Sequence, residues 1–399
     1  MKKRILSILL CCVMLVGLLP TAALAAGPDV WDGSTKAPSG SGSESAPYLI
    51  STGEELAWLA TLAAERSYYV QLTNDIILNE GTFDQSGNLS TSATPKEWTP
   101  AKKAVWHIDG NNHYISGMYI NSNDNDDVGL FSNLRGGSYV NNLTIKNSYV
   151  TASQSDKLRG VGVFAGQSSS NFTNCAGENN IVSANRYATG GIVGFSNGGS
   201  FNGIHTSGSI SGSKALGGLV GWVFGDTVFK NCWNEASVTG GKNCGGIVGD
   251  GGNHSDCYNC ANLGSGGITG STGRTIKNCY ILSEVDGYGG AANLLTTLND
   301  NLYKMDGMSG LKMWVMGTGG YPLPTGEPFV DTTEYYDVWL DGVRVGARNQ
   351  ADILENGLAS YNKDTKTLYL HDGLVVTNPY NKSLLYTEGD INLCVDGNV

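Results

Sequence analysis

The sequence has few charged residues and few histidines, and these shortages exclude several classes of function. Only 15% of its 399 residues are charged, and acidic residues outnumber basic ones by 36 to 25. Such a chain offers no basic patch for nucleic acid, so we expect no nucleic-acid partner. None of the five histidines lies in a recognisable nucleophile motif or in a His-Glu-x-x-His zinc-peptidase helix. We therefore predict no catalytic residues and a protein that is not an enzyme.

Long apolar runs are also scarce, because the only one stands at the start of the chain. Met1 to Arg4 carry positive charge, Ile5 to Leu19 are almost wholly apolar, and Ala23-Leu24-Ala25 is a typical cleavage site. Residues 1–25 are therefore predicted to be a signal peptide, which places the mature protein outside the cell, secreted or at the cell surface. A membrane anchor is the alternative, but the run is short for a membrane span and ends at Pro20. No transmembrane segment is expected after signal removal.

Dedicated disulfides and metal sites are not indicated either. Of nine cysteines, two lie in the predicted signal peptide, and the odd number that remains argues against a disulfide framework. Four residues have spacing that resembles a zinc site: Cys244, His254, Cys257 and Cys260. A weak calcium loop is one interpretation of three others: Asp124, Asp126 and Asp127. Repeat packing explains the cysteines without a metal, and the loop lacks the glycine and closing glutamate of an EF-hand. We predict no metal and no cofactor.

Glycine, in contrast, is abundant, with 56 residues, and much of it falls in a short phrase that keeps returning. The phrase Gly-Gly-Ile-Val-Gly at 190–194 reappears in close variants at 217–221 and 245–249. The successive steps are 29, 27, 28 and 21 residues when they are measured between Gly162, Gly191, Gly218, Gly246 and Gly267. A period in this range predicts an all-β solenoid whose rungs bury their apolar faces against one another. The paired glycines are expected to supply sharp corners and positive φ angles.

A second landmark follows each glycine phrase and contains an asparagine. The asparagines expected at matching places on successive rungs are Asn147, Asn174, Asn202, Asn231, Asn259 and Asn278. Asparagines stack at the turns of a β-helix, where their amides can hydrogen-bond along the stack. A cysteine follows four of them, and these cysteines are expected to form an inward column, since free cysteine is among the most buried residue types.

Composition divides the exported chain into three parts. Residues 26–46 are rich in Gly, Ser and Pro and are expected to form a flexible lead-in. Residues 47–326 carry the repeats, and a capping box at Thr52 predicts a short helix that covers the open end of the solenoid. Residues 330–399 contain hairpin signals such as Asp341-Gly342 and are expected to form a small β-rich module. The chain stops at a turn signal just after a strand, which suggests a truncated module.

The glycine and asparagine landmarks resemble the GLUG-motif repeats of secreted bacterial surface proteins. The resemblance includes the entry segment Pro47-Tyr48-Leu49-Ile50 and the phrase Asp109-Gly110-Asn111-Asn112, and it covers roughly residues 30–325. It implies a right-handed parallel β-helix on a secreted or cell-surface protein, often with an adhesin-like role. Some such repeats accompany immunoglobulin-cleaving metallopeptidases, but that activity does not transfer without a His-Glu-x-x-His motif.

Exposed aromatic residues are the candidate ligand contacts, because rings stack on sugar faces. The candidates are Trp222, Phe224, Trp233, Tyr258 and Tyr280, and the last two are expected at the place of Trp233 on later rungs. Some of these rings would instead belong to the core or to an edge of the solenoid. The expected partners are glycans or host extracellular proteins.

Three functions remain open at this point. Surface adhesion or carbohydrate binding on a rigid scaffold is the first. The second is a β-helix carbohydrate-active enzyme, a polysaccharide lyase or glycosidase, which would need clustered carboxylates on one face. The acids of the regular rungs do not recur in register: Glu178, Asp226, Glu235, Asp250 and Asp256. The third is a structural spacer that presents the C-terminal module.

Overall fold

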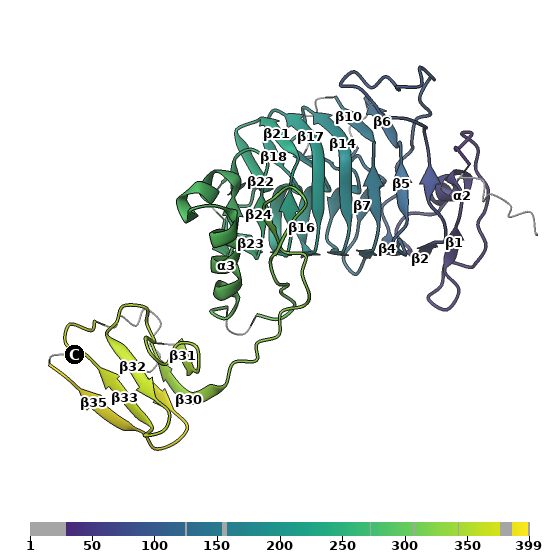
Figure 1. The fold of residues 1–399 in the computed structure, drawn as a ribbon. Coiled ribbons are helices and arrows are strands. Elements are labelled where there is room, and N and C mark those ends of the chain that lie inside the picture. The colour runs from purple at the N-terminus through teal and green to yellow at the C-terminus, as the bar shows by residue number, and fades with distance from the viewer. Residues whose placement is uncertain are drawn as a thin grey trace, which may run out of the picture. The chain divides into compact units, whose positions relative to one another are not determined.

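Parallel strands stacked along one axis make up most of the structure (Figure 1). The computed structural model describes residues 29–123, 126–153, 158–271, 273–305, 308–341, 343–375 and 385–397. The predicted signal peptide and Asp124 lie outside these residues. The chain divides into two units. The first comprises the residues up to Leu302 together with residues 308–328, and the second comprises residues 303–305 and the residues from Phe329 on. In the described part of the chain, no helix is long and apolar enough to span a membrane.

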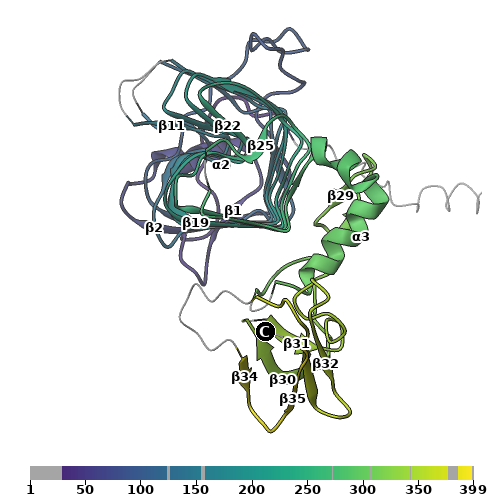
Figure 2. The same cartoon turned by 90° about the vertical axis from the view of Figure 1, so that its left-hand side faces the viewer.

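The first unit is a parallel β-solenoid, which confirms the predicted fold class. Two large sheets surround a common core, and their strands pair in parallel from one turn to the next. Seen end-on, successive turns lie over one another and outline one profile (Figure 2). The first sheet contains β1 (Tyr48–Ile50), β2 (Ser67–Leu72), β4 (Val105–Asp109), β7 (Phe131–Leu134), β8 (Tyr139–Asn141), β11 (Gly160–Val161), β12 (Ala165–Ser168), β13 (Asn171–Thr173), β15 (Ala188–Gly190), β16 (Val193–Asn202), β18 (Ala215–Gly217), β19 (Val220–Lys230), β22 (Asn243–Asp250), β23 (Ser255–Tyr258), β25 (Gly267–Thr269) and β26 (Thr275–Lys277). The second contains β3 (Ile76–Ile77), β5 (Tyr114–Ser116), β6 (Tyr119–Ser122), β9 (Thr144–Lys146), β10 (Tyr149–Ala152), β14 (Ala176–Ala184), β17 (His205–Gly212), β20 (Trp233–Asn234), β21 (Ser237–Gly240), β24 (Ala261–Asn262) and β27 (Tyr280–Ile281).

The core is built from columns of like residues on successive turns. Phe172, Phe201 and Phe229 are paired in register on β13, β16 and β19, and all three are buried. The ring of Phe201 stacks on those of Phe172 and Phe229, with centroids 4.8 and 5.0 Å apart. This spacing equals the separation of neighbouring strands, about 4.8 Å. Each ring therefore fills the gap that its neighbours leave.

The cysteines form an inward column, as the sequence predicts. Cys175, Cys232 and Cys260 are buried, and each Sγ donates to the carbonyl two residues earlier, at 3.4, 3.1 and 3.2 Å. Burial raises the pKa of the Cys175 thiol to about 12 and also raises the pKa of Cys260. These thiols are held neutral and act as small apolar side chains with one weak donor.

The recurring glycines are required by close packing, and within the glycine pairs the predicted positive φ occurs only at Gly266, with φ 84°. None of the five period glycines has a positive φ. A Cβ at Gly191 would meet the carbonyl oxygen of Gly218, and one at Gly218 would meet that of Gly246. One at Gly162 would stand 2.5 Å from the carbonyl oxygen of Ile192, and the site at Gly267 is less crowded. Adjacent turns approach so closely at this corner that only a residue without a side chain fits.

A ladder of asparagine amides follows the turn after the first-sheet strands. Nδ2 of Asn231 donates to Oδ1 of Asn202 at 2.7 Å, Asn259 donates to Asn231 at 2.8 Å, and Asn278 donates to Asn259 at 2.9 Å. On this turn the residue aligned with Asn231 is Gly203, which has a φ of 67°. Asn202, one residue earlier in the sequence, supplies the amide of the ladder instead. The predicted stacking of amides is therefore present, with a shift at this turn.

The prediction for Asn147 was wrong. Asn142, with φ 54°, occupies the place next to Asn174, whose Nδ2 donates to Oδ1 of Asn142 at 3.4 Å. Asn147 lies at the next corner of the same turn, where it accepts a hydrogen bond from Asn179 at 2.9 Å. The register is set by β8, which precedes Asn142 and pairs with β13. Residues 143–147 resemble the asparagine landmark in sequence, but they include β9 of the second sheet and do not follow a strand of the first sheet.

The lead-in contacts the solenoid at two places within residues 29–46, and its flexibility stays a prediction. Trp31 is 6% exposed, and its backbone N–H donates to the carbonyl of Ile77 at 2.8 Å. Ser39 and Leu49 form an antiparallel bridge.

The predicted capping helix is α2 (Gly53–Trp58), which continues into the 3₁₀ turn η1 (Leu59–Thr61). The Thr52 hydroxyl accepts from the backbone N–H of Glu55 at 3.4 Å. The Glu55 carboxylate accepts from the N–H and hydroxyl of Ser51 at 2.9 and 2.8 Å. These bonds satisfy donors at the helix start and tie the helix to β1.

A closing segment lies against the last turns of the solenoid. It comprises η2 (Leu282–Tyr288), α3 (Ala291–Leu302), β28 (Val315–Met316) and β29 (Pro322–Leu323). Between α3 and β28, the backbone bonds to the asparagine ladder: the Lys312 N–H donates to Asn231 at 2.8 Å, and Asn259 donates to the Lys312 carbonyl at 2.8 Å. Asn231 and Asn259 are fully buried as a result, whereas Asn174 is exposed.

The second unit has its own core and two small sheets. One sheet contains β30 (Tyr335–Leu340), β31 (Val343–Gly346) and β34 (Leu385–Thr387), and the other contains β32 (Ala359–Asn362), β33 (Thr367–Leu370) and β35 (Asn392–Val395). Leu340 pairs with Val343 across the predicted hairpin, in which Asp341 has φ 49°. The core contains Val338, Val345, Leu368 and their neighbours. The small β-rich module is therefore present.

Candidate functional site

The outward face of the first sheet carries a cluster of rings, here called the aromatic patch: Tyr187, Phe195, Trp222 and Phe224. Phe195 and Trp222 are paired on adjacent strands β16 and β19, with ring centroids 5.0 Å apart and edge to face. Tyr187 lies 4.5 Å from Trp222, and Nζ of Lys214 lies 4.8 Å from the Tyr187 ring. The patch therefore spans neighbouring turns and has a cation at its edge.

A β-bulge places Phe224 at the edge of this patch. Ser196 pairs with Val223 and Asn197 pairs with Gly225, so Phe224 is an extra residue with no partner on β16. Its side chain is 57% exposed, and its ring lies 6.1 Å from that of Trp222. Bulges re-aim side chains and are common beside functional sites. The break in register is what turns this large apolar ring toward solvent.

Four charged or titratable side chains stand beside the patch and form what we call the charged cluster: Asp226, His254, Asp256 and Arg274. Nδ1 of His254 lies 3.2 Å from Oδ1 of Asp226, and Nη1 of Arg274 lies 2.9 Å from the same oxygen. Nε of Arg274 donates to Oδ1 of Asp256 at 3.0 Å. The His254 ring is 6.3 Å from Phe224, so the cluster adjoins the patch.

Hydrogen bonds hold both carboxylates of the charged cluster in the ionised state. The bond from His254, followed by that from Arg274, lowers the pKa of Asp226. The bond from Arg274 lowers the pKa of Asp256 despite its burial. Sequence reasoning treated these acids as unrelated, because Arg274 joins them from the next turn, 18 residues beyond Asp256. No signal in the linear sequence indicates that pairing.

The structure separates the other predicted ligand residues from the patch. Trp233 lies on β20 in the second sheet and stacks on His205 at 4.7 Å, and His205 Nε2 lies 2.7 Å from a Glu235 oxygen. Tyr258 pairs with Lys230 and not with the column of Trp233, so its predicted alignment was wrong.

Tyr280 is in the Trp233 column, with Ala261 between them, but it is buried. Its hydroxyl donates to the Pro322 carbonyl at 2.6 Å, and its ring packs on Trp314 at 5.6 Å. The closing segment therefore covers it. Only Trp222 and Phe224, of the five candidates, lie together on one exposed surface.

The candidate zinc residues do not come together as a ligand set. Cys257 and Cys260 are buried in the core, and Cys244 Sγ donates to the Gly240 carbonyl at another corner. Asp127, from the candidate calcium loop, accepts from Arg159 and from the Gly160 N–H, both at 2.9 Å. Within the described ranges, no group of three or more His, Cys, Asp or Glu side chains has the arrangement of a metal site.

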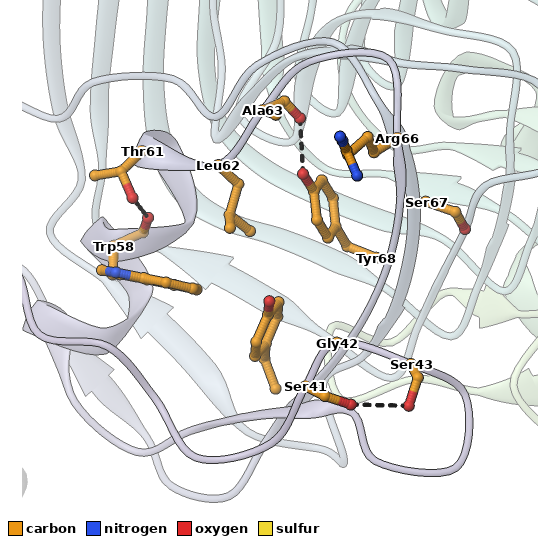
Figure 3. A pocket seen from close by; sticks show the side chains of 11 residues that line it. Ser41, Gly42, Ser43, Trp58, Thr61, Leu62, Ala63, Arg66, Ser67 and Tyr68 are labelled. Carbon is orange, nitrogen blue, oxygen red and sulfur yellow. Dashed lines mark hydrogen bonds between the residues drawn. The ribbon is translucent and has the colours of Figure 1, made fainter.

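A separate pocket of about 800 Å³ lies at the first turns of the solenoid (Figure 3). Its apolar wall is formed by Tyr48, Trp58, Leu62 and Tyr68. Its polar lining consists of Ser41, Ser43, Thr61, Arg66 and Ser67. Sequence reasoning did not find it, because β1, α2 and β2 contribute one ring each and nothing in their spacing joins the three.

No family model matches the chain. A stretch of 158 residues, 40% of this chain, is 31% identical to Halomucin of Haloquadratum walsbyi and spans 2% of that protein. A stretch of 125 residues, 30% of this chain, is 31% identical to an Evansella cellulosilytica protein named "Putative Gly-rich membrane protein" and spans 13% of it. The chain thus spans far less than two thirds of either relative.

Among solved structures, the chain is similar to a "putative immunoglobulin A1 protease" from Bacteroides ovatus, with a TM-score of 0.44 and 18% identity over 72% of this chain and 94% of that one. The resemblance to GLUG-motif repeats stays a prediction.

Proposed function

We propose that this protein is exported and that its solenoid presents the aromatic patch to bind glycans at a cell surface, without catalysing a reaction. Export is supported by the charged start, apolar run and small-residue cleavage site of residues 1–25. It is also consistent with partial likeness to a protein named as a Gly-rich membrane protein. The ligand follows from the chemistry of the patch.

The observation that carries the proposal is the bulged Phe224 beside Trp222. Phe224 is a large exposed ring and the half-buried Trp222 lies beside it on a rigid sheet. Together they offer an apolar surface on which a sugar face can stack. Hydrogen-bonding groups lie near them: Asp226 and Arg274 in the charged cluster, and Asp250, which pairs with Trp222 on the next strand. Polar groups around a ring are what a hydroxyl-rich ligand requires.

The proposal is tested by screening the purified protein on a glycan array and on immobilised mucin. Trp222→Ala and Phe224→Ala are expected to lower binding about tenfold or more, since covering a large ring contributes about 1.5 kcal/mol or more and about 1.4 kcal/mol corresponds to tenfold. Trp233→Ala is the matched control, because that half-buried tryptophan lies on the second sheet. Equal losses for all three variants, or binding that survives both patch variants, would refute the assignment.

A polysaccharide-cleaving enzyme is the competing function, because the charged cluster brings two carboxylates and an arginine beside the patch. Both carboxylates have lowered pKa values, so neither is held protonated as a general acid near neutral pH. This supports binding without cleavage. Incubation of the array-positive polysaccharide with the protein should release no fragments, and release that Asp256→Asn abolishes would replace the proposal by the enzymatic one.

A further inference from the structure

We propose that the pocket at the first turns of the solenoid binds a carboxylate-bearing pyranose, a uronic or sialic acid residue of a glycan. This inference stands on residues of β1, α2 and β2 and does not depend on the aromatic patch. About five strand spacings separate β2 from β19 along the sheet order, roughly 24 Å. The two sites are therefore distinct.

The pocket lies where the inward columns of the core begin. Tyr48 is paired with Val70, a core residue, and β1 stands first in the strand order of its sheet. On the inner turns the next strand covers such a side chain. Here the ring of Tyr48 is half-buried and forms part of the pocket wall. A ligand in the pocket would stack where a further turn of the solenoid would otherwise pack.

Three rings from separate elements form the apolar wall (Figure 3). Tyr48 and Trp58 meet edge to face with centroids 5.2 Å apart, and Tyr68 lies 6.4 Å from Tyr48. The Tyr68 hydroxyl donates to the Ala63 carbonyl at 2.9 Å, which fixes that ring in place. Rings held at angles to one another form a shaped pocket, and a pyranose ring has an apolar face of matching size.

The polar lining is positive, in a chain whose acids outnumber its bases. Arg66 is the only charged residue that lines the pocket, and its guanidinium has no hydrogen bond or ion pair with any described side chain. The neighbouring acid, Glu65, is engaged by Lys103 at 3.5 Å and by Arg135. An exposed, unpaired guanidinium beside apolar rings favours a carboxylate, which it can bind through two parallel hydrogen bonds.

Hydroxyl groups around the rim complete the match to a sugar. Ser41 and Ser43 hydroxyls lie 3.0 Å from each other on the loop that crosses the pocket, and the Thr61 hydroxyl donates to the Trp58 carbonyl at 2.7 Å. Each hydroxyl retains capacity to accept or donate a further bond. The pocket thus combines a stacking surface, one cation and several hydroxyls.

The test is an NMR titration of the purified protein with sodium glucuronate, N-acetylneuraminate and glucose. The eight tryptophans give eight indole N–H signals, and Trp58→Phe and Trp222→Phe assign the two of interest. Each sugar is added to about 50 mM, well above a millimolar dissociation constant, at constant ionic strength. We expect the Trp58 signal to shift and saturate with an acidic sugar but not with glucose. The two acids separate a uronic from a sialic source.

The variant Arg66→Gln should weaken binding of the acidic sugar about tenfold and leave the indole spectrum of the free protein unchanged. Lys102→Gln, which removes an exposed cation outside the pocket, is the matched control and should bind normally. A Trp58 signal that does not move, that moves equally with glucose, or that is indifferent to Arg66→Gln would overturn the proposal. Because Trp222 reports separately, failure here is distinguishable from failure of the aromatic patch.

Discussion

Inward and outward columns on the same strands of this solenoid follow different rules. Inside, β13, β16 and β19 each contribute one buried phenylalanine, and the three rings stack in register. Outside, the column shared by β12, β16, β19 and β22 changes at every turn: Gln167, Phe195, Trp222 and Asp250. The stacking of turns dictates the inner residues, so they repeat. The outer residues are free of that demand, and we propose that a departure from the repeat there, such as the bulge at Phe224, marks a binding surface.

The largest expected effect comes from breaking the inner column. Phe201→Ala would leave a cavity between Phe172 and Phe229 that close-packed turns cannot fill, at a cost of about 3–5 kcal/mol in the free energy of unfolding. Denaturant unfolding followed by circular dichroism measures it. A loss below about 1 kcal/mol would mean that the turns relax around the gap, and the distinction between inner and outer columns would fail.

The asparagine turns sharpen the comparison, because they are buried at Asn231, under the closing segment, and exposed at Asn174 on an earlier turn. Asn231→Gly removes the side-chain bonds to Asn202, Asn259, Gly310 and Lys312 and should cost about 1–3 kcal/mol. Asn174→Gly, on the exposed part, should cost less than about 1 kcal/mol. Glycine tolerates the positive φ of both sites, so neither variant is strained. The difference in unfolding free energy between the two variants, from denaturant titration, therefore measures how much the bonds to the closing segment stabilise the fold. Equal losses of unfolding free energy in the two variants would contradict a stabilising role for those bonds.

The buried thiols predict a loss of stability in alkali. The pKa of Cys175 is raised from its ordinary value near 9 to about 12, so the unfolded chain releases its proton first. The stabilising contribution is complete below about pH 9 and is lost as the pH rises toward 12, amounting to about 1 kcal/mol between roughly pH 8 and pH 10. Cys175→Val replaces the thiol by an aliphatic side chain of similar size and should flatten the pH dependence of the unfolding midpoint relative to wild type. An unchanged slope would show that this thiol is not the cause.

The smallest expected effect on stability is at the aromatic patch. Phe224→Ala removes an exposed ring at a bulge and should change the free energy of unfolding by less than about 0.5 kcal/mol. The same denaturation experiment checks it against Phe201→Ala. A large loss would assign Phe224 to the fold and would remove the basis for treating it as a ligand contact.

Sequence reasoning reached the fold because the inner contacts repeat. The glycine period, the Asn-Cys landmark and the cysteine column all reflect one turn packing on the next, so each was visible several times. It singled out Trp222 and Phe224 as candidates because large rings among polar residues stand out. It did not find that the closing segment buries Tyr280, since Pro322 is 42 residues away. It also missed the charged cluster and the N-terminal pocket, which form only when residues from separate turns or elements meet.

The most direct test of the account is one glycan-array comparison of wild-type protein and Phe224→Ala, each confirmed to unfold at the same denaturant midpoint. The account predicts that the bound glycans lose about tenfold or more of their signal while stability is unchanged. Unchanged binding at unchanged stability would contradict the claim that the break in the repeat carries the function.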